Sequence, residues 1–370
     1  MIIGVLGAGQ LGRMLALAGY PLGLRLRFFD PTPDAAAGEI APLMTGSYND
    51  HAALQEFAKG LDAVTYEFEN VPVEAARALG QWVPVLPGPR ALEVAQDRLV
   101  EKDFFRSVGV EPAPYRQVDS PSDAQAAVEE LGLPCILKTR RGGYDGKGQV
   151  VLRADFYAAD AWQEIGGVPA VMEGFVPFRR ELSLLSVRSA TGEVRCWPLV
   201  ENEHRDGILH LSRCPAREST DGLQEQANAH ARAVLEGLDY VGVLALEFFE
   251  LEGRLLVNEM APRVHNSGHW TIEGAQCSQF ENHLRAVAGL PLGSTELRGY
   301  SAMLNLVGDT PPTAELAACE GLHVHLYGKE PRPGRKLGHM GICSSTAAER
   351  EAVIERAESL LRKSSASVSG

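Results

Sequence analysis

The chain has 370 residues, of which 45% are hydrophobic and 22% are charged, and its formal net charge is −13. At about 100–200 residues per domain this length predicts two or three domains, each with a core of its own. The acidic balance argues against nucleic acid or an anionic membrane as a partner, and no apolar run approaches the roughly 18 residues of a membrane span. Six scattered cysteines without a C-x-x-C pair indicate reduced thiols. We therefore expect a cytoplasmic, multidomain protein.

The first 92 residues alternate short apolar strands with helices, which is typical of a parallel, doubly wound sheet. The expected helices are Gln10–Ala18 and a segment that contains Leu54–Ala58. The expected strands are Met1–Leu6, Leu24–Phe29, Ala63–Phe68 and Val83–Leu86. The last of these strands runs into a proline-rich segment, which marks a domain boundary.

From residue 90 onward the pattern changes to a long helix followed by consecutive antiparallel strands, which favours an α+β domain. The expected helices are Arg90–Val108, Ala227–Leu235 and, near the end of the chain, Ala347–Arg362. The expected strands are Pro134–Thr139, Gln149–Leu152, Ala170–Val176, Glu181–Val187, Val194–Leu199, Gly242–Glu250, Leu255–Met260, Ala302–Val307 and His323–Tyr327.

A glycine loop follows the first strand. The residues from Gly7 to Gly12 fit G-x-G-x-x-G between a strand and a helix, and Asp30 closes the next strand. This is the dinucleotide-binding fingerprint, in which the acidic residue binds a ribose hydroxyl and the helix N-terminus binds phosphate. On this loop alone three interpretations stay open: a nicotinamide-dependent dehydrogenase, a monophosphate site, or a tight turn with an incidental aspartate.

A second glycine loop lies between two predicted strands, with four glycines between Gly142 and Gly148. A hairpin of this kind can fold over phosphates and donate backbone N–H groups to them. Lys138 on the entering strand and Lys147 in the loop would neutralise phosphate oxygens. A solvated hairpin tip explains the glycines but not these cations, so the pattern favours phosphate binding.

Two glutamates interrupt the apolar strands of a predicted hairpin. A turn centred on Gly253 places Glu247 and Glu259 opposite each other, each six residues from the turn. Like charges in this position are destabilising unless a cation bridges them or one is protonated. Oxygen ligands suit Mg²⁺, which one or two carboxylates commonly hold together with nucleotide phosphates. Asn258 could add a neutral ligand, whereas a register slip of one residue would separate the carboxylates.

Two further segments gather cations and polar groups. The segment Pro262–Trp270 contains Arg263, His265, Asn266 and His269, a set that suits a small oxyanion. Ordinary loop hydrogen bonding is the alternative for its histidines, especially His269. The segment Lys329–Lys336 holds four cations in eight residues, and both a phosphate clamp and a solvated face stay open there.

These motifs together resemble the ATP-grasp superfamily and, within it, the N5-carboxyaminoimidazole ribonucleotide synthetases. The resemblance extends from Gly7 to His339. Its most specific stretches are Gly7–Gly12, Tyr66–Pro72, Gln96–Leu99, Gly142–Gln149, His204–Leu209, Asn258–Trp270 and Arg332–His339. It implies a Rossmann-like domain at 1–92, a central ATP-grasp fold at 93–295 and a small C-terminal domain at 296–370.

The resemblance also implies roles for individual residues. ATP would contact Arg98, Lys138, Gly143, Tyr144, Asp145, Gly146, Lys147, Gly148, Gln149, Glu173, Gly174, Phe175, Val176, Glu181, His204, Asn258 and Glu259. The ribonucleotide would contact Gly9, Gln10, Leu11, Tyr144, Asp145, Lys329, Arg335 and Lys336. Glu247 and Glu259 would hold Mg²⁺. Arg263, His265 and Asn266 would serve the reaction itself, with Arg263 and His265 facing bicarbonate.

The implied activity is that of a carbon–nitrogen ligase of purine biosynthesis. Bicarbonate attacks the γ-phosphate of ATP to give carboxyphosphate, and the CO₂ released from it is captured by the amine of aminoimidazole ribonucleotide. ATP and Mg²⁺ are the expected cofactors, and the family favours a homodimer. A sibling ligase that acts on another phosphorylated amine with formate, a nicotinamide-dependent dehydrogenase and a non-catalytic nucleotide-binding regulator are the alternatives.

Overall fold

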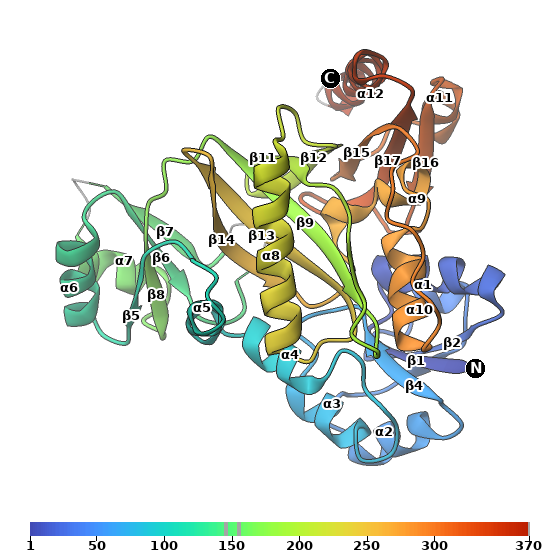
Figure 1. Ribbon diagram of the computed structural model, residues 1–370, viewed down its shortest axis with the longest axis horizontal. Helices are drawn as coiled ribbons and strands as arrows, with labels where there is room; N and C mark the ends of the chain where they lie inside the picture. The colour runs from blue at the N-terminus through green and yellow to red at the C-terminus, as the bar shows by residue number, and fades with distance from the viewer. Residues whose placement is uncertain (144–146, 154–156, 369–370) are drawn as a thin grey trace.

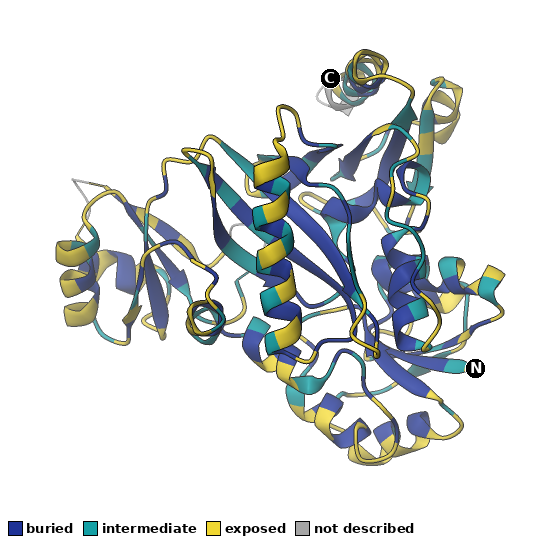
Figure 2. Cartoon of the chain, in the orientation of Figure 1, coloured by how far each residue is buried: buried dark blue, intermediate teal, exposed yellow. Residues whose placement is uncertain are grey.

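The computed structural model describes residues 1–143, 147–153 and 157–368. Three β-sheets carry the fold: a parallel sheet near the N-terminus, a small antiparallel sheet at the opposite end and a nine-stranded sheet between them (Figure 1). The strands of the central sheet are largely buried, whereas the outer faces of the surrounding helices are exposed (Figure 2). The mixed α/β architecture predicted from the sequence is confirmed.

The N-terminal sheet has four parallel strands in the order β3-β2-β1-β4. They are β1 (Ile2–Leu6), β2 (Arg25–Asp30), β3 (Leu43–Thr45) and β4 (Ala63–Tyr66). The strand predicted at Val83–Leu86 is wrong, because only Val85 forms a single parallel bridge, to Val64. Pro84 and Pro87 flank this position, and prolines lack the N–H group that a longer ladder requires.

Seven helical segments accompany this sheet and lead out of it. They are α1 (Gln10–Gly19), η1 (Tyr20–Leu22), η2 (Ala36–Glu39), α2 (His51–Ala58), α3 (Val73–Leu79), α4 (Pro89–Ala95) and α5 (Arg98–Ser107). The single helix predicted over Arg90–Val108 is therefore two helices. Asp97 makes the break, because its carboxylate caps α5 by accepting from the N–H groups of Leu99 and Val100.

The small sheet has the strand order β5-β8-β6-β7. Its elements are β5 (Tyr115–Val118), α6 (Pro121–Leu131), β6 (Cys135–Thr139), β7 (Gln149–Leu152), α7 (Ala158–Glu164) and β8 (Ala170–Gly174). The strand predicted to reach Val176 ends at Gly174, which pairs with Cys135, the first residue of β6. Pro134 precedes Cys135 and has no N–H to extend the ladder.

The large sheet runs in the order β14-β13-β9-β11-β12-β15-β17-β16, and β10 pairs with β9. Its strands are β9 (Arg180–Arg188), β10 (Val194–Cys196), β11 (Val200–Arg205), β12 (Ile208–Cys214), β13 (Gly242–Leu251), β14 (Arg254–Ala261), β15 (Tyr300–Val307), β16 (Leu322–Leu326) and β17 (Lys336–Ser344). The C-terminal strands thus continue the central sheet. The sequence reading missed β11, β12 and β17, because polar and glycine residues interrupt their apolar pattern.

Six helical segments belong to this half of the chain: α8 (Asp221–Gly237), η3 (Asn266–Gly268), α9 (Thr271–Gly274), α10 (Gln279–Val287), α11 (Thr313–Ala318) and α12 (Ala347–Val368). Helix α8 crosses the face of the large sheet (Figure 1). It begins six residues before the predicted Ala227, because Thr220 caps it by accepting from the N–H of Leu223. Within the described residues, no helix is long and apolar enough to cross a membrane.

A buried histidine connects the N-terminal sheet to the central sheet. His283 of α10 accepts the N–H of Val243 in β13 on its Nδ1 atom, at 3.1 Å. Its Nε2 atom lies 2.8 Å from the hydroxyl of Thr65 in β4. Both nitrogens of the neutral ring thus take part in hydrogen bonds. Burial lowers the pKa of His283 from 6.5 to about 4.

We expect this histidine to make the fold sensitive to acid. The unfolded chain takes up a proton near pH 6.5 and the folded chain only near pH 4, so the free energy of unfolding is unaffected by this group above pH 6.5. Below pH 6.5 the free energy of unfolding falls, and it has lost about 3 kcal/mol when the pH reaches 4. Urea unfolding should show a smaller loss for His283→Gln, which preserves both hydrogen bonds, than for the wild type. The same loss in both proteins would contradict this role, and His51→Gln, at an exposed position, serves as the control.

Candidate active site

One large cavity, of about 990 Å³, lies where the N-terminal sheet, the small sheet and the large sheet meet. Most of the residues proposed from the sequence line it. They are Gln10, Leu11, Arg98, Lys138, Gly143, Gln149, Glu181, His204, Glu247, Asn258, Glu259, Arg263, His265, Asn266, Lys329 and Lys336. Side chains from segments up to 326 residues apart in the chain therefore face a common space.

The remaining predicted residues do not line this cavity or lie outside the described residues. Among those described, the residues behind or beside the wall are Gly9, Lys147, Gly148, Glu173, Gly174, Phe175, Val176 and Arg335. Tyr144, Asp145 and Gly146 belong to the second glycine loop and lie outside the described residues. The strands that carry this loop are confirmed as an antiparallel pair, with Lys138 opposite Gln149.

The two glutamates of the hairpin lie directly opposite each other, as predicted. The turn itself consists of Glu252 and Gly253, both with positive φ, so it is centred between them and not on Gly253. With a regular ladder from this turn, Glu247 would face Asn258. A β-bulge between Glu247 and Phe248 makes Asn258 the extra residue and brings Glu259 opposite Glu247.

The donor set at this bulge fits a hard divalent cation. Glu247 and Glu259 supply carboxylates, and the buried side-chain oxygen of Asn258 has no hydrogen-bond partner among the described residues. Burial and the neighbouring charge of Glu259 raise the pKa of Glu247 from 4.5 to about 7. The shift reflects the burial of Glu247 and its repulsion by a second carboxylate, which a bridging cation would relieve. The described residues contain no group of three His, Cys, Asp or Glu side chains able to hold a metal. Mg²⁺, which needs few protein ligands beside phosphates, suits the site better than a metal with a full protein cage.

Cations flank the carboxylate pair. Arg98, the first residue of α5, places Nη1 3.0 Å from a carboxylate oxygen of Glu259. The Lys138 ammonium lies 2.8 Å from Glu173, whose other oxygen lies 3.0 Å from the buried Lys102. Although burial opposes ionisation, these two lysines hold the pKa of Glu173 at about 2. Glu173 therefore positions Lys138 from behind the cavity wall.

A buried carboxylate occupies the first glycine loop. Glu67, two residues from Glu69 at the end of β4, accepts the N–H groups of Gly9 at 2.8 Å and Gly12 at 2.9 Å. Asp30 accepts the N–H of Ala8 at 2.9 Å. The N–H donors of the loop and its acidic residue thus already have partners within the protein. A bound dinucleotide would need the same groups for its pyrophosphate and its ribose. The dehydrogenase interpretation of this loop is wrong.

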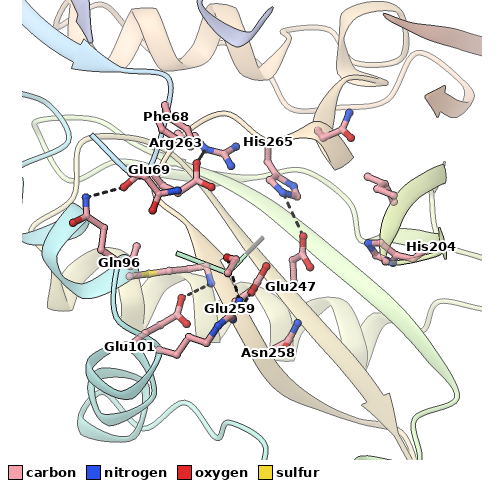
Figure 3. A pocket seen from close by; sticks show the side chains of 18 of the residues that line it. Phe68, Glu69, Gln96, Glu101, His204, Glu247, Asn258, Glu259, Arg263 and His265 are labelled. Atoms are coloured by element: carbon pink, nitrogen blue, oxygen red, sulfur yellow. Dashed lines mark hydrogen bonds and ion pairs between the residues drawn. The ribbon is translucent and has the colours of Figure 1, made fainter. Parts of the chain in front are cut away.

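In Figure 3, Arg263 and His265 lie on one side of Glu247, and Asn258 lies on the other. Arg263 pairs with Glu69, and this guanidinium holds the pKa of the half-buried Glu69 below its ordinary value although burial alone would raise it. The Nδ1 atom of His265 accepts the N–H of Ser267 at 3.3 Å, so the proton of the neutral ring lies on Nε2, 3.3 Å from Glu247. Burial holds the pKa of His265 well below its ordinary value, and the positive charge of the nearby Arg263 adds a smaller effect in the same direction.

Asn266 and His204 also lie at the wall, each with a defined partner. Asn266 exchanges two hydrogen bonds with the amide of Asn305, at 3.0 and 2.6 Å, which commits its side chain to holding β15 against η3. His204 lies 2.8 Å from Glu181. Burial would lower the pKa of His204, but the hydrogen bond and charge of Glu181 raise it.

The basic segment near the C-terminus is divided between the cavity and the surface. Lys329 donates to the side-chain oxygen of Gln10 in the first glycine loop, and Lys336 also lines the cavity. Arg335 instead bonds the backbone oxygen of Glu330 at 3.1 Å, and Arg332 is exposed. Arg332 therefore belongs to a solvated face, whereas Lys329 and Lys336 face the cavity, and the phosphate clamp stays a prediction for these two lysines.

Several residues that shape the cavity were given no role from the sequence, although Tyr66–Pro72 and Gln96–Leu99 are among the family-like stretches. These residues are Glu67, Glu69, Gln96, Glu101 and Lys102. The polar residues Glu67, Glu69 and Asn70 directly after the apolar β4 were the available signal, because parallel strands end at a common edge where ligands bind. Gln96 donates to the backbone oxygens of Glu69 and Val71, which fixes this edge to the start of α5.

A cleft between two antiparallel sheets, lined by paired carboxylates, by cations and by residues at the base of a glycine hairpin, defines an ATP-grasp enzyme. Residues 103–280 match the ATP-grasp domain family, residues 1–96 match the ribonucleotide synthetase preATP-grasp domain, and residues 301–353 match the phosphoribosylaminoimidazole carboxylase C-terminal domain. The N5-carboxyaminoimidazole ribonucleotide synthase of Pseudomonas aeruginosa is 52% identical over 361 residues, which cover 98% of this chain and 99% of that protein. The chain belongs to the family of N5-carboxyaminoimidazole ribonucleotide synthases, which are ATP-grasp ligases.

Solved structures of the same family superimpose over nearly the whole chain. The synthetase from Thermus thermophilus has a TM-score of 0.93 and 57% identity, with 97% of this chain and 98% of that chain covered. The synthase from Aspergillus clavatus, solved with ADP and 5-aminoimidazole ribonucleotide, has a TM-score of 0.91 and 31% identity, with 98% of each chain covered. The arrangement of the three sheets is therefore common to these enzymes.

Proposed function

We propose that this chain carboxylates 5-aminoimidazole ribonucleotide to N5-carboxyaminoimidazole ribonucleotide in de novo purine biosynthesis, with ATP and bicarbonate as co-substrates. The names of its relatives support this activity. The observation that carries the proposal is the single cavity in which Arg98 and Lys138 flank the Glu247–Glu259 pair while Arg263 and His265 stand beside it. A nucleotide site and an oxyanion site are thus contiguous.

ATP would lie between the small sheet and the large sheet. Its phosphates would meet Arg98, Lys138 and the second glycine loop, including Gly143, Lys147, Gly148 and Gln149. Its adenosine would meet the segment from Glu173 to Val176 together with Glu181 and His204. Glu247, Glu259 and Asn258 would hold Mg²⁺, which supplies charge neutralisation at the phosphates when bound. Phosphoryl transfer requires mainly that the reacting groups are positioned and that the negative charge of the phosphates is neutralised.

Bicarbonate would bind at Arg263, whose planar fork matches an oxyanion. A bicarbonate oxygen attacks the γ-phosphorus, the bond to ADP breaks, and carboxyphosphate forms. His265 is neutral because burial and Arg263 lower its pKa, so its ring would orient bicarbonate by hydrogen bonding without adding charge. The aminoimidazole ribonucleotide would bind near Gly9, Gln10 and Leu11, with its phosphate at Lys329 and Lys336, and its amine captures the CO₂ released from carboxyphosphate.

The activity is tested by ADP release. The purified protein should release ADP from ATP only when both bicarbonate and aminoimidazole ribonucleotide are present, because the phosphate acceptor and the CO₂ acceptor would share one cavity with ATP. An equal rate without either substrate would overturn the proposal. ATP binding without turnover would indicate a regulator, and turnover with formate and another phosphorylated amine would indicate a sibling ligase.

We also propose the division of the chain at residues 92 and 295, a homodimeric assembly and a cytoplasmic location. The boundaries near the three family matches support the division. The assembly is tested by light scattering of the purified chain. The location follows from the proposed use of ATP, and cell fractionation tests it.

A further inference from the structure

A series of buried polar side chains crosses the large sheet and ends at His265. Ser212, Asn202 and Ser183 lie on the neighbouring strands β12, β11 and β9, point to the same face of the sheet and are at most 6% exposed. Ser212 donates to Oδ1 of Asn202 at 2.7 Å, and Nδ2 of Asn202 donates to Ser183 at 2.9 Å. Ser183 donates to Oγ of the fully buried Ser267 in η3 at 2.9 Å. That oxygen lies 2.9 Å from Nδ1 of His265, so these four side chains, the buried series, lead to the ring.

One backbone group fixes the direction of the hydrogen bonds in the buried series. The N–H of Ser267 donates to Nδ1 of His265, and because an amide nitrogen only donates, Nδ1 carries no proton. The hydroxyl of Ser267 has a single proton, so it donates that proton to Nδ1 and accepts from Ser183. By the same argument Ser183 accepts from the amide group of Asn202, whose oxygen accepts from Ser212. All of these bonds agree with one tautomer of His265, in which the proton lies on Nε2.

The main chain of His265 is also held in place. Gln279 of α10 is fully buried, accepts the N–H of His265 at 2.8 Å and donates to its carbonyl oxygen at 2.7 Å. The Nε2 atom faces Glu247, 3.3 Å away, at the cavity (Figure 3). Glu247 in turn pairs with Ser183 across β13 and β9. The sheet face that carries the buried series therefore also carries one of the paired carboxylates, and the ring directs an N–H bond, not a lone pair, into the cavity.

We propose that the buried series positions His265 for bicarbonate, an inference that rests on the proposed function. Its four members are positioning residues that hold the ring in the tautomer whose Nε2–H donates to an oxygen of bicarbonate. In the other tautomer Nε2 would present a lone pair, which repels the oxygen lone pairs of the anion. His265 therefore binds the anion as a neutral donor beside the guanidinium of Arg263 and does not act as a base.

The tautomer is tested by nitrogen-15 NMR of the full chain labelled in its histidine rings. A ring nitrogen without a proton resonates well downfield of a protonated one, and the signals absent from His265→Gln belong to His265. In the wild type at neutral pH, Nδ1 should be unprotonated and Nε2 protonated. In Ser183→Ala the signals should shift toward a mixture of both tautomers, because the Ser267 hydroxyl loses its donor and can accept a proton from Nδ1. A wild-type ring with its proton on Nδ1 would overturn the proposal.

Kinetics distinguish this role from a contribution to folding. In Ser183→Ala, kcat/KM for bicarbonate should fall about fivefold while the KM for ATP is unchanged, because one orienting hydrogen bond is lost at the anion alone. Ser186→Ala is the matched control. Ser186 is also fully buried in β9, but it points to the other face of the sheet and donates to the backbone oxygen of Leu244. This control should keep the wild-type spectrum and both kinetic values.

Three results would overturn the positioning role. They are a Ser183→Ala variant with wild-type spectrum and bicarbonate kinetics, a changed spectrum with unchanged kcat/KM for bicarbonate, and equal losses in Ser183→Ala and Ser186→Ala. Ser267→Ala removes the next hydroxyl and should produce the same two changes if Ser183→Ala does not yield folded protein. A wild type that releases ADP equally without bicarbonate would instead overturn the proposed function, whereas the tautomer is measured without turnover.

Discussion

Glu259→Gln should lower kcat by about a thousandfold, because it removes one carboxylate of the pair that would hold Mg²⁺. The substitution also removes the ion-pair partner of Arg98, which lies 3.0 Å from Glu259. Glutamine preserves the shape of the strand, so the loss should reside in turnover and not in folding. Initial rates of ADP release measured across a series of Mg²⁺ concentrations should show a shift of the half-maximal concentration to a higher value.

Glu252→Gln is the matched control for this variant. Glu252 is an exposed residue of the turn in the same hairpin, so its loss of charge should leave kcat and the Mg²⁺ dependence unchanged. A Glu259→Gln variant with a kcat near that of the wild type would contradict the assignment of the paired carboxylates to the metal.

Arg263→Lys should lower kcat/KM for bicarbonate by about a hundredfold while the KM for ATP changes little. Lysine keeps the charge but loses the planar fork that grips an oxyanion with two parallel hydrogen bonds. It also weakens the pairing with Glu69, whose pKa Arg263 holds down, and so loosens the end of β4 beside the cavity. Steady-state rates with bicarbonate and ATP varied separately distinguish the two KM effects.

Arg254→Lys provides the comparison, because Arg254 is exposed at the start of β14, the strand that leads to Arg263. It should match the wild type for both substrates. An equal increase of the KM values for ATP and bicarbonate in Arg263→Lys would contradict a specific role at the oxyanion and would indicate a general disturbance of the site.

The local features of this protein were readable from its sequence. The alternation of strands and helices indicated a parallel first sheet, and the apolar runs that follow indicated antiparallel pairs, because side-chain periodicity reflects which faces are buried. The hairpin around Gly253 even predicted that Glu247 would face Glu259. That prediction assumed a turn centred on one glycine, whereas the observed pairing depends on a bulge at Asn258, which a local pattern does not reveal.

What the tertiary structure alone decided is which groups meet and which are already engaged. The first glycine loop has the pattern of a dinucleotide site. Its N–H groups, however, donate to Glu67, which lies 55 residues beyond Gly12. Lys329 reaches Gln10 across 319 residues of sequence, and Asn305 commits the amide of Asn266. Sequence patterns record the chemistry that a segment carries, but a hydrogen bond between distant segments depends on the packing of whole sheets. The family motifs therefore marked the residues of the site, and the fold determined which of them remain available to a ligand.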